Sequence, residues 1–195
     1  MGSIHGKAKG HLEGMDRVTE NIWIGNCTAG AKVVLGSDPP YTKQGITHVL
    51  DVSDKIHYTP DEKQHKVKVL KAGMSDYGRS ALNEKHLKLC FNYMKEAIAS
   101  GSKVLVHCHV GINRSATIVI AYLMKTRGYS LERALKFVRQ NREVEPAAYV
   151  KKLKGYEKQL VNEGVIDVEK ERQAVAKLSE DKEADAMLAL AGFCN

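Results

Sequence analysis

The sequence predicts an α/β fold in which helices flank a central, mostly parallel sheet. Short apolar stretches of strand length alternate along the chain with longer stretches whose apolar residues recur at helical spacing. The clearest case is Val104–Val106, typical of a buried strand, which is followed by a glycine-containing loop and by Thr117–Met124, an apolar run too long for a strand. Because open α/β sheets bind ligands where a strand passes into the next helix, this loop is the predicted site.

The N-terminal part predicts an arm, a strand, a helix and a loop. Residues 1–15 are rich in glycine and lack an apolar period, so we expect a flexible arm. Val18–Gly25 alternates like a strand, and Thr28–Leu35 is expected to form a short helix. Gly36–Pro40 is expected to be a loop, because its consecutive prolines lack backbone donors.

The following segments supply the rest of the sheet and the helices that cover it. Two further strands are expected at Ile46–Val52 and Lys66–Leu70. Amphipathic or apolar helices are expected at Leu82–Ser100, from about Arg114 to Gly128, after a cap at Ser130, and at Ala148–Asn162. At 195 residues, the chain is expected to form one α/β domain from these elements.

Residues 161–195 are expected to form a charged helical extension. Asp167–Leu190 contains neither glycine nor proline, and its apolar residues follow no sustained heptad. This helix could pack on its own domain, pair with a second copy to form a homodimer, or be a partly ordered tail.

The excess positive charge lies outside this extension. Residues 1–150 hold 22 Lys and Arg against 14 Asp and Glu, whereas residues 151–195 hold 8 against 9. Such a surface would attract phosphorylated ligands and, less selectively, RNA or anionic membrane, or it could simply be solvated.

The four cysteines are Cys27, Cys90, Cys108 and Cys194. Their spacing predicts neither a disulfide framework nor a metal site, and we expect no metal and no organic cofactor. With no signal peptide and no apolar run of membrane-spanning length, we expect no membrane association and a reducing compartment, the cytoplasm or also the nucleus.

The loop between Cys108 and Arg114 has the composition of an oxyanion site. Five residues separate the two, enough to wrap the backbone once around a tetrahedral anion, with loop N–H groups and a helix N-terminus directed at it. This positive environment favours the thiolate of Cys108, a nucleophile, and the planar Arg114 fork matches two phosphate oxygens. Ser115 is expected to hydrogen-bond the sulfur.

This stretch, from His107 through Cys108 and Arg114 to Ser115, resembles the signature of the cysteine-dependent protein phosphatases, and its continuation Ala116-Thr117 resembles their dual-specificity branch. The resemblance covers roughly residues 16–160. It implies an atypical single-domain enzyme that hydrolyses phosphotyrosine and phosphoserine or phosphothreonine of protein substrates through a phosphocysteine. It also implies that His107 orients the loop and that phosphate is bound by Arg114 and by the loop residues His109, Val110, Gly111, Ile112 and Asn113.

The general acid is also assigned through this resemblance. Asp76 lies 32 residues before Cys108, in a loop of small residues, at about the remove where the family places the proton donor. Asp54, in the preceding loop, is the reserve candidate. An aspartate serving only a turn would be the alternative for Asp76.

Three other functions are considered. The pair Asn113-Arg114, together with the basic charge, resembles RNA 5′-phosphatases of the same superfamily, but Ser115-Ala116 departs from their pattern, so nucleic acid is an unlikely partner. A lipid phosphatase is disfavoured because the loop interior carries no lysine. A catalytically dead phosphopeptide-binding module is disfavoured by the joint presence of Cys108, Arg114 and Asp76.

Overall fold

The computed structural model describes residues 11–36, 38–55, 67–78 and 82–177. In this part of the chain one sheet of six strands has the order β1-β2-β3-β6-β4-β5. The strands are β1 (His11–Leu12), β2 (Met15–Arg17), β3 (Ile22–Gly25), β4 (Ile46–Asp51), β5 (Lys68–Lys71) and β6 (Lys103–His107). β6 pairs in parallel with both β3 and β4, and β4 pairs in parallel with β5, whereas β1 and β2 form an antiparallel edge. The predicted α/β fold with a mostly parallel sheet is confirmed.

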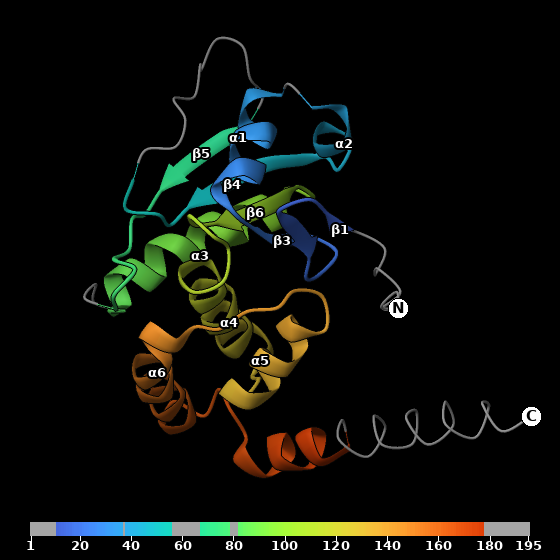
Figure 1. Cartoon of the computed structure of the whole chain (residues 1–195). Helices are drawn as coiled ribbons and strands as arrows, with labels where there is room; N and C mark the ends of the chain where they lie inside the picture. Colours follow the sequence, from blue (N-terminus) through green and yellow to red (C-terminus); the bar gives the residue numbers. More distant parts are fainter. Residues whose placement is uncertain (1–10, 37, 56–66, 79–81, 178–195) are drawn as a thin grey trace, which may run out of the picture.

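Helices cover both faces of the sheet (Figure 1). One face carries α1 (Cys27–Leu35) and α2 (Pro39–Thr42), and the other carries α3 (Glu84–Ala99), α4 (Arg114–Arg127), α5 (Leu131–Arg139), the 3₁₀ turn η1 (Ala147–Tyr149) and α6 (Val150–Asn162). Successive strand side chains point to opposite faces, so Leu105 joins the core beneath α1 while Val104 and Val106 join the core beneath α3 and α4. Burial on both faces explains why β6 is apolar throughout its centre.

The flexible arm predicted over residues 1–15 is wrong at its C-terminal end. Met15 is fully buried and lies in β2, which pairs antiparallel with β3. β1, at His11–Leu12, pairs with β2 in turn, so residues 11–15 belong to the sheet. Residues 1–10 lie outside the described part. The strand predicted from Val18 begins only at Ile22, because the Val18 N–H bonds to the Ile22 carbonyl across a turn. The Thr19 hydroxyl accepts from the Ile22 N–H and completes that turn.

The loop predicted over Gly36–Pro40 contains the start of a helix. Pro39 and Pro40 occupy the first turn of α2, where backbone N–H groups have no intrahelical acceptor and a proline therefore costs nothing. The other elements agree with the predicted segments, with ends that differ by a few residues.

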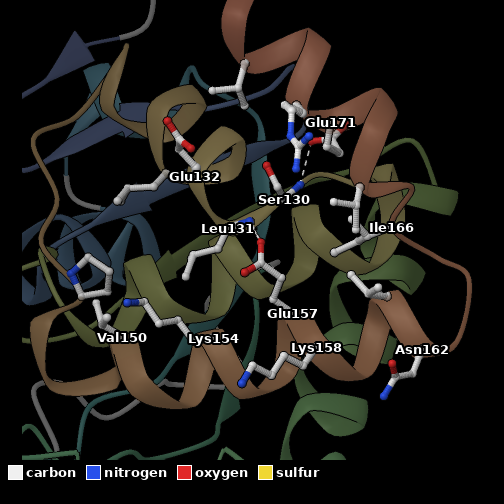
Figure 2. A pocket seen from close by; sticks show the side chains of 16 residues that line it. Ser130, Leu131, Glu132, Val150, Lys154, Glu157, Lys158, Asn162, Ile166 and Glu171 are labelled. Carbon is white, nitrogen blue, oxygen red and sulfur yellow. Dashed lines mark hydrogen bonds between the residues drawn. The ribbon is translucent and has the colours of Figure 1, made fainter.

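Within the predicted extension, residues 168–177 are helical and pack on their own domain. Glu171 is buried, accepts a hydrogen bond from the Ser130 N–H at 2.7 Å and pairs with Arg133 at 2.6 Å. Figure 2 shows Glu171 and Glu157 directed at the N-terminus of α5, on the wall of a largely apolar cavity of about 820 Å³ between α5, α6 and this helix. Residues 178–195 lie outside the described part, and the homodimer stays a prediction.

Candidate active site

The thiol of Cys108 lies at the bottom of the loop that joins β6 to α4, here called the phosphate loop (residues 108–114). Only 2% of Cys108 is exposed. The Gly111 N–H donates to its sulfur at 3.2 Å, and the Ser115 hydroxyl lies 3.4 Å from the same atom. Gly111 adopts a left-handed backbone, φ +80°, and a Cβ there would lie 2.5 Å from the Gly25 carbonyl oxygen. The predicted neighbours of the sulfur are therefore brought together by a turn that only glycine fits.

The surroundings of Cys108 favour its thiolate. Burial by itself raises the pKa, but the hydroxyl and N–H of Ser115, the Gly111 N–H and the charge of Arg114 outweigh it and leave the pKa below the ordinary thiol value. Cys90, on the buried side of α3, has fewer such partners, namely a backbone N–H and His86 Nε2 at 3.7 Å, and burial raises its pKa to about 12. Both cysteines are buried, so the opposite directions of their pKa shifts arise from the hydrogen-bond donors and the charge around Cys108 and not from exposure.

Arg114, the first residue of α4, points its guanidinium at two carboxylates. The residue is 2% exposed, and its Nη1 donates to Asp54 Oδ1 at 2.6 Å and to the Met74 carbonyl at 3.3 Å. Its Nε lies 3.1 Å from Asp76 Oδ1, close enough for an ion pair, but the N–H does not point along that line as a hydrogen bond requires. The structure thus places both candidate acids, Asp76 and Asp54, at this arginine.

The two carboxylates are held differently. The hydrogen bond from Arg114 lowers the pKa of Asp54, partly against desolvation. Asp76 is held from the other side, because the Asn113 amide donates to its backbone carbonyl at 3.1 Å and to its Oδ1 at 3.4 Å. Both carboxylates are about half exposed, so either could meet a bound substrate.

The loop that carries Asp76 is also fastened to the start of α6. The Tyr149 hydroxyl donates to the Ser75 carbonyl, and Lys152 Nζ donates to the Gly78 carbonyl at 2.6 Å. Gly78 has φ +68°, and a Cβ there would lie 2.2 Å from the Ala148 carbonyl oxygen. Sequence patterns gave no sign of these contacts, which join residues 74 positions apart.

His107 lies beneath the phosphate loop and is fully buried. Its Nδ1 lies 3.3 Å from the Cys108 carbonyl oxygen, and its Nε2 lies 3.9 Å from Asp51 Oδ1, at the end of the neighbouring strand β4. A Cβ at Gly30 of α1 would lie 2.6 Å from Nε2, so the ring fits only because residue 30 is glycine. Local sequence patterns did not indicate Asp51. Its role would follow only from the pairing of β4 with β6, which places Asp51 opposite His107.

The remaining loop residues face outward or brace the turn. Val110 and Ile112 are exposed, at 51% and 38%, and His109 Nδ1 lies 3.5 Å from the Cys27 sulfur. The Glu145 N–H donates to the Ile112 carbonyl, which fastens the loop to the segment after α5.

Within the described residues, no cluster of three or more His, Cys, Asp or Glu side chains could hold a metal ion. No helix in this part of the chain is long and apolar enough to cross a bilayer.

Arg142 is a further contact of the phosphate loop that sequence patterns did not reveal. Its Nε donates to the Gly111 carbonyl at 2.8 Å and its Nη2 to the Val110 carbonyl at 3.3 Å. Its Nη1 pairs with Asp16 Oδ2 of β2 at 2.6 Å. From the sequence, residue 142 was expected only to lie in the segment that ends the helix after Ser130.

The chain is similar to known proteins in sequence and in fold. Residues 29–159 match the family model of the dual specificity phosphatase catalytic domain. Dual specificity protein phosphatase 1 of Arabidopsis thaliana is 33% identical over 147 residues, which cover 73% of this chain and 69% of that protein. The human DUSP28 crystal structure aligns with a TM-score of 0.65 at 28% identity, covering 78% of this chain and 99% of that one.

A second structural neighbour is the human tyrosine phosphatase-like serine/threonine/tyrosine-interacting protein. Its crystal structure aligns with a TM-score of 0.65 at 26% identity, covering 75% of this chain and 97% of that one. The family model spans residues 29–159, well over half of the 195-residue chain. The chain therefore belongs to the dual specificity phosphatase family.

Proposed function

We propose that this protein hydrolyses phosphotyrosine and phosphoserine or phosphothreonine of protein substrates through a phosphocysteine intermediate. The observation that carries the proposal is the convergence at Cys108, where the Gly111 N–H and the Ser115 hydroxyl reach a buried sulfur beside the guanidinium of Arg114. A phosphate seated on the loop N–H groups would present phosphorus to that sulfur.

The first step transfers the phosphoryl group. The Cys108 thiolate forms a bond to phosphorus while the bond from phosphorus to the substrate oxygen breaks, and Asp76 gives its proton to that oxygen. In the second step Asp76 accepts a proton from water, whose oxygen displaces the sulfur as inorganic phosphate forms. Ser115 stabilises the sulfur as it leaves, and Arg114 with the loop N–H groups stabilises the equatorial oxygens.

Asp76 suits the role of acid better than Asp54. A directed hydrogen bond from Arg114 Nη1 lowers the pKa of Asp54 and so favours its ionised form, which makes Asp54 the poorer proton donor. Asp76 lies beside Nε without such a directed bond and is fixed mainly through Asn113. We therefore assign Asp54 the positioning of the Arg114 fork.

The proposed chemistry draws its positive charge from the protein. Arg114, the loop N–H groups and the N-terminus of α4 supply the stabilisation that metal ions give in other phosphoryl-transfer enzymes, so we propose that no cofactor takes part.

Because a thiolate nucleophile needs a reducing environment, we propose the cytoplasm as the location of the protein, with the nucleus as an alternative.

Turnover of matched phosphopeptides tests the proposal. Purified protein should release phosphate from phosphotyrosine and phosphothreonine peptides faster than from 5′-triphosphorylated RNA, and Cys108→Ser should bind the peptides without turnover. Faster hydrolysis of the RNA would favour an RNA 5′-phosphatase. Peptide binding by the wild type without phosphate release would favour a binding module instead.

A further inference from the structure

The backbone of the phosphate loop connects Arg142 to the catalytic sulfur through one peptide group. The Val110 carbonyl and the Gly111 N–H belong to the same planar unit, so they point in opposite directions. Arg142 Nη2 donates to that carbonyl at 3.3 Å, and the N–H donates to Cys108 Sγ at 3.2 Å. A cation on the oxygen of a peptide group both fixes its rotation and polarises its N–H toward an acceptor.

The next peptide group is held in the same way. Arg142 Nε donates to the Gly111 carbonyl at 2.8 Å, which holds that oxygen toward Arg142 and directs the following N–H, that of Ile112, away from it. A Cβ at Gly111 would lie 2.7 Å from Arg142 Nη2. The shape of the loop and the seat of the guanidinium therefore depend on each other.

Asp16 explains why Arg142 stays on the loop. Asp16 lies in β2 and is 4% exposed. Its Oδ2 pairs with Nη1, the third guanidinium nitrogen of Arg142, at 2.6 Å. A buried carboxylate needs such a charged partner, and the Arg142 side chain, which is 13% exposed, finds an acceptor for each of its three guanidinium nitrogens. The pair therefore fastens the loop to the antiparallel edge of the sheet.

From these contacts we propose that Arg142, held by Asp16, is a positioning residue that fixes the Val110–Gly111 peptide group with its N–H directed at the sulfur of Cys108. It does not touch the reacting atoms and acts through the loop. The proposal deepens the proposed function, but its consequence for the thiol can be measured without any phosphorylated substrate.

Other charged groups also face Cys108 and must be left intact. Arg114 lies beside it from α4, with Asp54 and Asp76 as the partners of that arginine, and His107 and Asp51 lie beneath the loop. Substitution of Arg142 leaves all of these side chains in place. A change in the titration of Cys108 in such a variant therefore reports the peptide group and the charge of Arg142 itself.

The test is the rate of alkylation of Cys108 by iodoacetamide as a function of pH, followed on the Cys108 peptide by mass spectrometry. In Arg142→Gln the pH midpoint should rise by about half a unit to one unit, the scale set by loss of one hydrogen bond to the thiolate. Arg142→Lys, which keeps the charge but cannot hold both carbonyls, should show most of the same rise. Arg133→Gln, which breaks an equally short pair with Glu171 away from the loop, is the matched control and should leave the midpoint unchanged.

A wild-type midpoint in Arg142→Gln, or full restoration by Arg142→Lys, would overturn the positioning role. If Arg142→Gln does not fold, as judged by its thermal melt, the lysine variant carries the same test. Asp16→Asn should lower kcat/KM for an aryl phosphate about tenfold in the wild type but add nothing in the Arg142→Gln background, because the two act as one unit. If the wild type hydrolyses no phosphate ester, the proposed function fails while the alkylation result still decides the role of Arg142.

Discussion

Replacing Asp76 by asparagine should slow the enzyme in a way that depends on the leaving group. The change keeps the size of the side chain and its neighbourhood to Arg114 and Asn113 but removes the transferable proton. General acid catalysis contributes about 10²–10⁴-fold, so turnover of alkyl and phenolic phosphates should fall within that range. A leaving oxygen that is already stable as an anion needs little proton donation, and such a substrate should lose far less.

Asp54→Asn is the matched comparison, because it alters the other carboxylate on the same arginine. Its bond to Nη1 is short at 2.6 Å, but the carboxylate is 48% exposed, so solvent takes over part of its role and we expect a loss of about tenfold. That loss should be the same for every leaving group, because it arises from a poorly aligned Arg114. The assay is kcat/KM across aryl phosphates of graded leaving-group acidity. A uniform loss from Asp76→Asn, or a graded one from Asp54→Asn, would exchange the two assignments.

Three further outcomes follow from the same geometry. Arg114→Lys should reduce kcat/KM for phosphopeptides nearly as much as Cys108→Ser, since the charge survives but the bidentate fit does not, and a slight loss in steady-state assays would contradict the clamp. Iodoacetamide should modify Cys108 with a pH midpoint below the ordinary thiol value, because the pKa of Cys108 is lowered. Cys90 should stay unmodified at neutral pH, because its pKa is raised to about 12. Equal labelling of the two cysteines in peptide maps would refute this. Gly30→Ala should lower both the melting temperature and the activity, because the added methyl would lie 2.6 Å from His107 Nε2, and an unchanged melting curve would show that the ring can move aside.

Local patterns predicted the centre of the site because its parts are close in sequence. Cys108, Arg114 and Ser115 lie on one strand–loop–helix unit, and the spacing of the sulfur and the guanidinium fixes how far the loop can wrap. The prediction of Asp76 as the general acid depended on the family resemblance as well, since no local pattern marks a proton donor. The structure then showed that Asp54, the reserve candidate, reaches the same arginine.

The supporting residues could not be predicted in this way. Asp16 and Arg142 are 126 positions apart, and the partners of the Asp76 loop are 74 positions away, so only tertiary packing brings them together. The β1–β2 hairpin was missed for a related reason, because strands of two and three residues carry no period and are stabilised by their pairing with β3. The short helix α2 was missed because prolines, which end helices, are tolerated in a first turn.

Charge balance explains why two carboxylates at one arginine suit this chemistry. Arg114 brings one positive charge, whereas the Cys108 thiolate, Asp54 and Asp76 bring three negative ones when all are ionised. A phosphate dianion adds two more, and nearby like charges favour the neutral form of whichever carboxylate can take a proton. Asp54 is the poorer choice, since its directed bond with Arg114 stabilises its ionised form. Asp76, which lies beside Arg114 Nε without such a directed bond, therefore remains the carboxylate proposed as the general acid.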